Sequence, residues 1–215
     1  MSIQSALVIG AGGGVGHATV DALTAAGARV LAAGRERDAS DPEQVAALLD
    51  EADPDLVVVA AGARPHMASI DEQTWETFSR AWNVDVRIAF EVGRAALTRP
   101  LRPNSTVLIV SSCAALNGSP MSGGYAGAKK MQMFLAGYLQ RASDARDLGI
   151  RFVSLAPRAF LVGTAIGEAA AATYGAETGP LDPAGVARAI VSIASGEEYP
   201  DATLLAVTGK GVETI

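Results

Sequence analysis

Short apolar runs alternate along this chain with longer segments in which apolar residues recur every three or four positions. The alternation is typical of a parallel sheet covered by helices, because strands buried on both faces are apolar throughout whereas covering helices bury one stripe. The sequence therefore predicts one α/β domain over residues 1–215, doubly wound, with a parallel sheet flanked by helices. Strands are expected at residues 6–9, 29–33, 56–60, 107–110, 151–155 and 204–207, and helices at 15–26, 42–50, 71–98, 122–147 and 183–194.

Two of the expected helices carry more specific signals. Pro42 suits the first position of a helix that Ser40 or Asp41 can cap. In the segment 122–147 the apolar residues fall at three- and four-residue steps, which predicts that they form one buried stripe of a long helix. These residues are Met131, Phe134, Leu135, Tyr138 and Leu139.

One long segment, residues 157–180, has no clear period. It is rich in Ala and Gly and lies between the last two expected strands. Because long irregular segments of this kind often cover active sites, we expect residues 157–180 to act as a substrate lid.

Composition and charge exclude several classes of protein. Hydrophobic residues make up 49% of the chain and charged residues 19%, so the chain can bury a core and is not disordered. The net charge of −6 argues against a nucleic-acid partner and against a basic membrane-binding patch, and apolar runs such as 56–63 are too short to span a membrane. Cys113 has no second cysteine to pair with, so we expect a cytoplasmic protein. His17 and His66 lack the spacing of metal ligands, so we expect no metal site.

Glycines crowd the turn between the first expected strand and the first expected helix. Such a turn lets the pyrophosphate of a dinucleotide approach the backbone, and the helix N-terminus offers it unpaired amides. A structural turn without a ligand is the plain alternative. The sequence predicts a Rossmann-type dinucleotide site here, formed by Gly10, Gly12, Gly13, Gly14, Val15 and Gly16.

The glycine spacing resembles that of the short-chain dehydrogenase/reductase family, and further matches follow in order. Ser112 follows an expected strand and lies 13 residues before Tyr125, and Tyr125-Ala-Gly-Ala-Lys129 matches the family's Tyr-x-x-x-Lys. Lys129 lies one helical turn after Tyr125, so its ammonium can favour the ionised phenol. A core tyrosine beside an apolar-stemmed lysine is the alternative. The resemblance extends from Gly10 to about Val207.

The resemblance implies a function and a role for each matched residue. It implies transfer of a hydride between a nicotinamide cofactor and a small carbonyl or alcohol substrate. Ser112 would hydrogen-bond the carbonyl oxygen, Tyr125 would exchange its proton with it, and Lys129 would hold the nicotinamide ribose. Asn83 would anchor a water in the proton relay from Lys129. Further cofactor contacts are expected at Asp38, Ala60, Ala61, Gly62 and Pro157.

Cofactor preference is expected to be decided at the end of the second strand. Arg35 stands there after Gly34, and a guanidinium suits the 2′-phosphate of NADP better than the ribose diol of NAD. We therefore expect NADP(H) to be preferred. Glu36 is a contrary signal, and a solvated surface arginine is the alternative.

The chain also departs from the family pattern, at Ile9, Val59 and Arg158. These departures leave open a dinucleotide-binding regulatory protein without turnover, and the matched residues leave open a dehydratase or epimerase. The resemblance further implies a homodimer or homotetramer formed through the two long helices.

Overall fold

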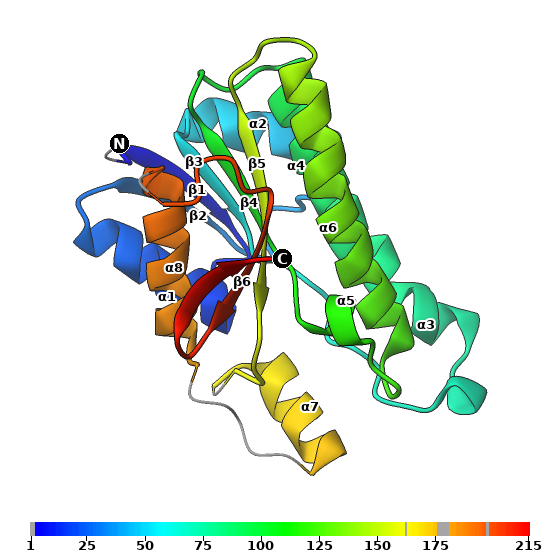
Figure 1. The fold of residues 1–215 in the computed structure, drawn as a ribbon. Coiled ribbons are helices and arrows are strands. Elements are labelled where there is room, and N and C mark those ends of the chain that lie inside the picture. Colours follow the sequence, from blue (N-terminus) through cyan, green and yellow to red (C-terminus); the bar gives the residue numbers. More distant parts are fainter. Residues whose placement is uncertain (1–2, 162, 176–180, 197) are drawn as a thin grey trace.

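A single seven-stranded sheet runs through the computed structural model, which describes residues 3–161, 163–175, 181–196 and 198–215 (Figure 1). The strand order is β2-β1-β3-β4-β5-β6-β7. Strands β1 to β6 pair in parallel, and β7 pairs antiparallel with β6. The bounds are β1 Ser5–Ile9, β2 Arg29–Ala33, β3 Leu56–Val59, β4 Thr106–Val110, β5 Arg151–Pro157, β6 Leu204–Thr208 and β7 Gly211–Thr214. The predicted doubly wound α/β fold is confirmed.

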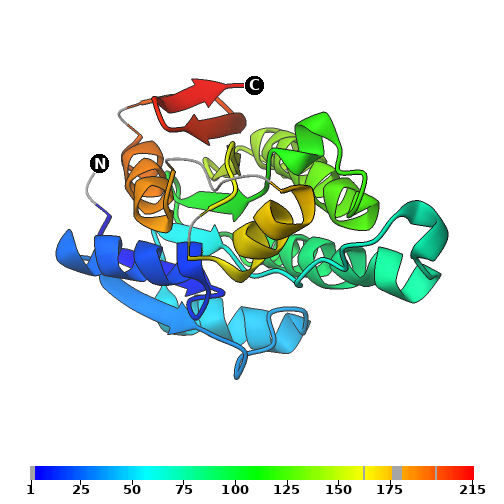
Figure 2. The ribbon, with the colours of Figure 1, turned by 90° about the horizontal axis from the view of Figure 1, so that it is seen from below.

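Helices cover both faces of the sheet, as Figures 1 and 2 show from two directions. The helices α1 (Gly14–Ala25) and α8 (Pro183–Ser195) pack together on one face, and α2 (Pro42–Ala52), α4 (Arg87–Thr98) and α6 (Gly123–Asp144) cover the other. Three shorter helices, α3 (Trp75–Ala81), α5 (Ala114–Asn117) and α7 (Ala165–Tyr174), lie toward the carboxyl ends of the strands (Figure 1). Within the described residues, no helix has the length and apolarity that a membrane span requires.

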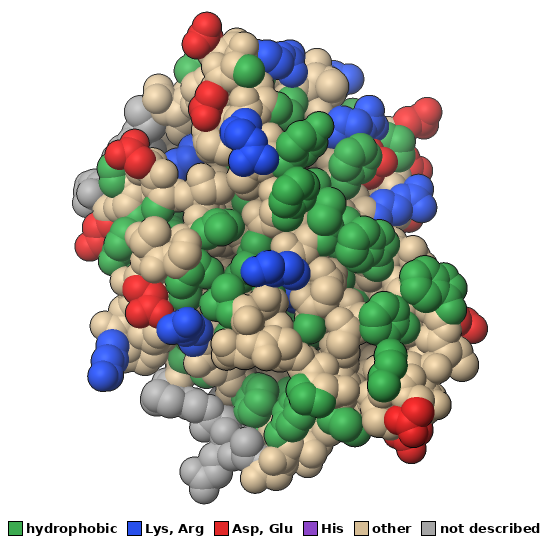
Figure 3. Space-filling model, turned by 45° about the vertical axis from the view of Figure 1, so that its right-hand side comes forward, with side chains coloured by type: hydrophobic (Ala, Val, Ile, Leu, Met, Phe, Trp, Pro, Cys, Tyr) green, Lys and Arg blue, Asp and Glu red, His purple; other side chains and the backbone are tan. Residues whose placement is uncertain are grey.

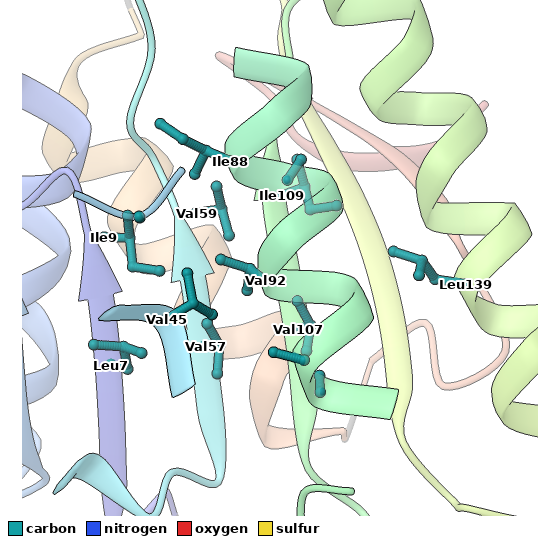
Figure 4. Close-up of a cluster of buried hydrophobic side chains, with 14 of the residues drawn as sticks. Leu7, Ile9, Val45, Val57, Val59, Ile88, Val92, Val107, Ile109 and Leu139 are labelled. Carbon is teal, nitrogen blue, oxygen red and sulfur yellow. The ribbon is translucent and has the colours of Figure 1, made fainter. Parts of the chain in front are cut away.

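The core consists of two layers because successive side chains of a strand point to opposite faces of the sheet. One layer packs against α2, α4 and α6, and part of it is drawn in Figure 4. The other packs against α1 and α8. Strands buried on both sides must be apolar at every position, which is why their sequences have no polar alternation. The first layer includes Leu7, Ile9, Val57, Val59, Val107 and Ile109, and the second Ala6, Val8, Leu56, Val58 and Leu108.

The helix starts follow local capping chemistry. Of the two candidate caps before α2, Asp41 is the one used: its carboxylate accepts a hydrogen bond from the Glu43 amide at 2.8 Å. Pro42 takes the first helical position, where its missing N–H costs nothing. The expected helix 71–98 is divided because Thr74 caps a new helix at α3, after the short 3₁₀ segment Ile70–Glu72. A π-helical segment, Trp82–Val86, then joins α3 to α4.

The expected buried stripe on α6 is only partly correct. Leu135 and Leu139 are buried, and Met131 is half-buried. Phe134 and Tyr138 are 57% and 56% exposed, and their rings stack on each other at 6.1 Å. The prediction for these two aromatic residues was wrong. Positions 134 and 138 each precede a buried leucine by one residue, so they lie on a different face of the helix from the buried row.

Candidate active site

A cavity of about 680 Å³ opens at the carboxyl ends of the strands, beside α7. In Figure 1 these strand ends point down toward α7. The strand order reverses between β1 and β3, and crevices at such a switch point are where α/β sheets bind ligands. Residues from segments far apart in sequence line this cavity, among them Gly14, Arg35, Gly62, Ser112, Tyr125, Lys129, Pro157 and Thr164.

The glycine turn forms one end of the cavity. Gly10 has a φ of +88°, and a Cβ there would lie 2.5 Å from the Ala61 amide nitrogen. A Cβ on Gly16 would collide with the Gly10 carbonyl oxygen. These two glycines therefore shape the turn. Gly16 also lines the cavity, together with Gly13, Gly14 and Val15. A Cβ on Gly12 would meet nothing within 4 Å.

Four charged residues follow β2, and each makes different contacts. Arg35 lines the cavity and is exposed. Glu36 turns back and accepts a hydrogen bond from the Gly34 amide at 2.8 Å; backbone hydrogen bonds from its own amide and from Gly34 lower its pKa. Arg37 pairs with Glu51 at 3.0 Å. Asp38 accepts hydrogen bonds from Ser40, which lower its pKa, and it is not among the lining residues. Of the two arginines at the end of β2, Arg35 is thus the one that lines the cavity.

Ser112, Tyr125 and Lys129 all line the cavity. Ser112 follows β4, and its Oγ accepts a hydrogen bond from the Ala114 amide at 3.2 Å. Tyr125 and Lys129 share one face of α6, and the Lys129 Nζ lies 5.5 Å from the centre of the Tyr125 ring. Burial raises the pKa of Tyr125, while the Lys129 ammonium and the Ser112 hydroxyl act to lower it. The structure thus brings together a phenol, a hydroxyl and an ammonium.

The Lys129 ammonium is itself buried, with 4% of the residue exposed. Its Nζ donates to the Val110 carbonyl oxygen at 3.3 Å and to Gln132 Oε1 at 3.0 Å, and it lies 3.1 Å from Asp85 Oδ2. Burial acts to lower the pKa of Lys129, but the Asp85 carboxylate raises it, and the result is a raised pKa. Lys129 therefore stays charged inside the protein.

The structure does not bring Asn83 to this site. Asn83 is exposed, and its Nδ2 lies 3.4 Å from Ser79 Oγ on the preceding helical turn. The side chain beside Lys129 is Asp85, which sequence reasoning missed. The π-helical turn at residues 82–86 changes which positions face α6, and a period of 3.6 does not anticipate it. The available signal was an acidic residue between Val84 and Val86.

The remaining expected cofactor residues divide into two groups. Ala60, Gly62 and Pro157 line the cavity, whereas Ala61 lies behind them against Gly10.

Two of the departures from the family pattern, Ile9 and Val59, are register partners in adjacent strands, and both are buried. The third, Arg158, points to the edge strand and pairs with Glu213 at 2.6 Å.

The segment expected to act as a lid contributes part of the cavity wall. Phe160, Leu161 and Ile166 line the cavity, and α7 begins where the Thr164 hydroxyl accepts a hydrogen bond from the Gly167 amide. The Tyr174 hydroxyl, at the end of α7, lies 2.7 Å from the Ser119 hydroxyl and accepts from the Met121 amide at 3.2 Å. Residues 162 and 176–180 of the expected lid lie outside the described residues.

Comparison with known proteins gives one family and many similar folds. The family model described as enoyl-(acyl carrier protein) reductase matches residues 35–198. A short chain dehydrogenase from Mycobacterium avium is 23% identical, with a TM-score of 0.75 over 99% of this chain and 85% of that one. No curated protein matches.

Two further similar structures are described as complexes with a dinucleotide. A short chain dehydrogenase from Burkholderia cenocepacia J2315 in complex with NADP is 22% identical, with a TM-score of 0.73 over 89% of this chain and 90% of that one. The 3-ketoacyl-(acyl-carrier-protein) reductase from Brucella melitensis complexed with NADH is 20% identical, with a TM-score of 0.79 over 96% and 97%. At these identities the likeness establishes the fold.

Proposed function

Because this chain belongs to the short-chain dehydrogenase/reductase family, we propose that it is an NADP(H)-dependent oxidoreductase that interconverts a carbonyl and an alcohol. The observation that carries the proposal is one continuous cavity that is lined both by the N-terminus of α1 and by Ser112, Tyr125 and Lys129. A dinucleotide fits this arrangement, because the glycine turn leaves room for its pyrophosphate and the first amides of α1 can donate to it. The NADP and NADH in two similar structures agree with such a ligand.

Each residue of the group then has a chemical task. When bound, the nicotinamide supplies or accepts the hydride. Ser112 orients the substrate by donating to the carbonyl oxygen, and Tyr125 gives that oxygen a proton as negative charge develops on it. Lys129 holds the nicotinamide ribose by giving up one of its present hydrogen bonds for one to a ribose hydroxyl. Its charge stabilises the tyrosinate that remains after proton transfer. In the reverse direction Tyr125 receives the proton.

The side chains that line the cavity indicate what kind of group the substrate carbonyl is attached to. They are largely apolar, with Met67, Phe160, Leu161 and Ile166 facing the cavity. We therefore propose a substrate whose carbonyl is attached to an apolar body, with α7 as the cover that excludes water during hydride transfer.

A cofactor oxidation assay across diverse apolar ketones and aldehydes tests this function. Consumption of NADPH in proportion to alcohol formed is the expected result. Tight dinucleotide binding with no turnover of any carbonyl compound or alcohol would favour the regulatory protein instead. Product formed with no net change in the cofactor would indicate a dehydratase or epimerase.

Arg35→Ala is expected to weaken NADPH binding about tenfold and leave NADH binding nearly unchanged. The guanidinium contributes a charge-assisted contact to the 2′-phosphate, reduced by solvent screening at this exposed position. Calorimetric titration of both cofactors measures the change. Arg37→Ala is the matched control, because that guanidinium is paired with Glu51. Equal wild-type affinities for NADPH and NADH would contradict the proposed preference.

Phe134→Asp is expected to convert a homodimer or homotetramer into monomers. Phe90 of α4 joins Phe134 and Tyr138 of α6 as exposed aromatic residues, and Figure 3, which brings this side of the molecule forward, shows hydrophobic side chains gathered on it. A second copy of the chain would cover this face, and a buried charge would oppose its docking. Sedimentation velocity measures the mass, with Ile70→Asp as the exposed control outside α4 and α6. A monomeric wild type would refute the proposed assembly.

A further inference from the structure

A buried ion pair lies beside Tyr125. The Lys129 ammonium and the Asp85 carboxylate approach to 3.1 Å, and their side chains are only 6% and 0% exposed. Asp85 Oδ1 accepts a hydrogen bond from the Ala63 amide at 2.7 Å. Oδ2 has no hydrogen-bond partner among the described residues, so its compensating interaction is the ionic contact with Lys129. A carboxylate this deep in the protein requires a cation beside it.

Helix α6 and the loop after β3 fix the position of this carboxylate. Gln132 of α6 accepts from Lys129 through Oε1 and donates through Nε2 to the Asp85 carbonyl oxygen at 3.0 Å, and it is fully buried. Gly62, after β3, allows the close approach, because a Cβ there would lie 2.8 Å from Asp85 Oδ2. The carboxylate is thus built into the site and cannot swing to solvent without breaking these contacts.

The pair changes the electrostatic field that Tyr125 experiences. An isolated ammonium one turn away would favour the phenolate, but a carboxylate in contact with that ammonium opposes its field. The charged and titratable groups that face the phenol are Lys129 from α6, Asp85 from the π-helical turn and Cys113 from the loop after β4. Burial raises the pKa of the Cys113 thiol, which keeps it neutral. Asp85 is therefore the negative charge that opposes ionisation of Tyr125.

We infer that Asp85 is a positioning residue that acts through Lys129 to keep the Tyr125 phenol protonated, and so sets the pH above which the tyrosinate needed for alcohol oxidation forms. The inference rests on the proposed function. Reduction consumes the phenol proton, which moves to the carbonyl oxygen while the carbonyl carbon receives the hydride of the reduced cofactor. Oxidation requires the phenolate, which takes the hydroxyl proton of the alcohol while the hydride leaves its carbon. A phenol that ionises only at high pH therefore shifts the onset of alcohol oxidation to higher pH.

The first test is a titration that needs neither cofactor nor substrate. NMR of the cofactor-free protein, with tyrosine labelled at the ring carbon that bears oxygen, follows each phenol as pH rises, and Tyr125→Phe identifies the signal of Tyr125. In the wild type this signal should titrate above the ordinary tyrosine range, in agreement with the raised pKa of Tyr125, whose main cause is burial and to which the Asp85 carboxylate adds. In Asp85→Asn it should titrate at lower pH. An unchanged titration in a folded Asp85→Asn protein overturns the inference.

The second test uses turnover in both directions. With the negative charge removed, Tyr125 ionises at lower pH, so the pH limb of alcohol oxidation by Asp85→Asn should move about one pH unit lower, and the alkaline fall of carbonyl reduction should move with it. A merely structural role for Asp85 would lower both rates and leave the pH profile in place.

Controls separate the possible outcomes. Asp55→Asn removes the same charge from a carboxylate that also accepts backbone amides, from Gln4 and Ser5, but at the other end of the strands, and it should not move the pH profile. If Asp85→Asn does not fold, the wild-type titration decides, and ionisation of Tyr125 at or below the ordinary tyrosine range overturns the inference. A wild type without turnover, combined with a Tyr125 titration that responds to Asp85→Asn, refutes the proposed function and leaves the electrostatic assignment intact.

Discussion

Tyr125→Phe is expected to reduce turnover by a factor of about 10² to 10⁴, the usual contribution of a positioned proton donor. The substitution removes the phenol proton and keeps the ring, so the cavity retains its shape. The alkoxide that forms as hydride arrives would then have no acid in place, and its charge would be only partly stabilised by Ser112. Steady-state rates with a substrate found by screening measure the effect.

Dinucleotide affinity separates this effect from damage to the site. Tyr125→Phe should bind the cofactor almost as tightly as the wild type, whereas Lys129→Ala should lose both affinity and turnover, because it also leaves the buried Asp85 carboxylate without a cation. Tyr138→Phe is the matched control, since it makes the same change at an exposed position on the same helix. If Tyr125→Phe kept most of the wild-type rate, another group would be the acid.

Gly16→Ala is the second change from which we expect a large effect. A methyl group at this buried position would collide with the carbonyl oxygen of Gly10, and a backbone carbonyl cannot rotate aside as a flexible side chain can. The turn must open, which should lower the free energy of unfolding by about 1 to 3 kcal/mol and abolish measurable dinucleotide binding. Thermal unfolding and calorimetric titration measure the two quantities.

Gly12→Ala provides the control within the same turn. Its added methyl group would meet nothing within 4 Å, so stability should stay close to that of the wild type. Equal losses of stability in Gly12→Ala and Gly16→Ala would mean that the turn responds to any side chain. The contact with the Gly10 carbonyl oxygen would then not be what excludes a side chain at position 16.

Features that depend on short stretches of sequence were predictable. The buried strands follow from continuous apolar runs, the turn at residues 10–16 from its glycines, and the shared face of Tyr125 and Lys129 from a four-residue step on a helix. The gathering of Ser112, Tyr125 and Lys129 around one cavity agrees with that local pattern.

Features set by tertiary context were not predictable in the same way. Asp85 reaches Lys129 because a π-helical turn shifts the helix face, and Asn83 is left in solvent. The aromatic pair of Phe134 and Tyr138 has the spacing of core residues, yet lies on the surface. Strand β7 is short and pairs antiparallel at the sheet edge, where little burial is needed and the apolar signal is weak.

The Ile9 and Val59 register pair has a consequence for how such a sequence can change over generations. Both side chains are buried and lie side by side on one face of the sheet, from adjacent strands. A lineage that exchanges an apolar pair for a polar one by single substitutions must pass through an intermediate in which one buried polar group has no partner, at a cost of about 1 to 3 kcal/mol. Descendants that fold therefore inherit the two positions as one coupled trait, and substitutions at either one are filtered by the other.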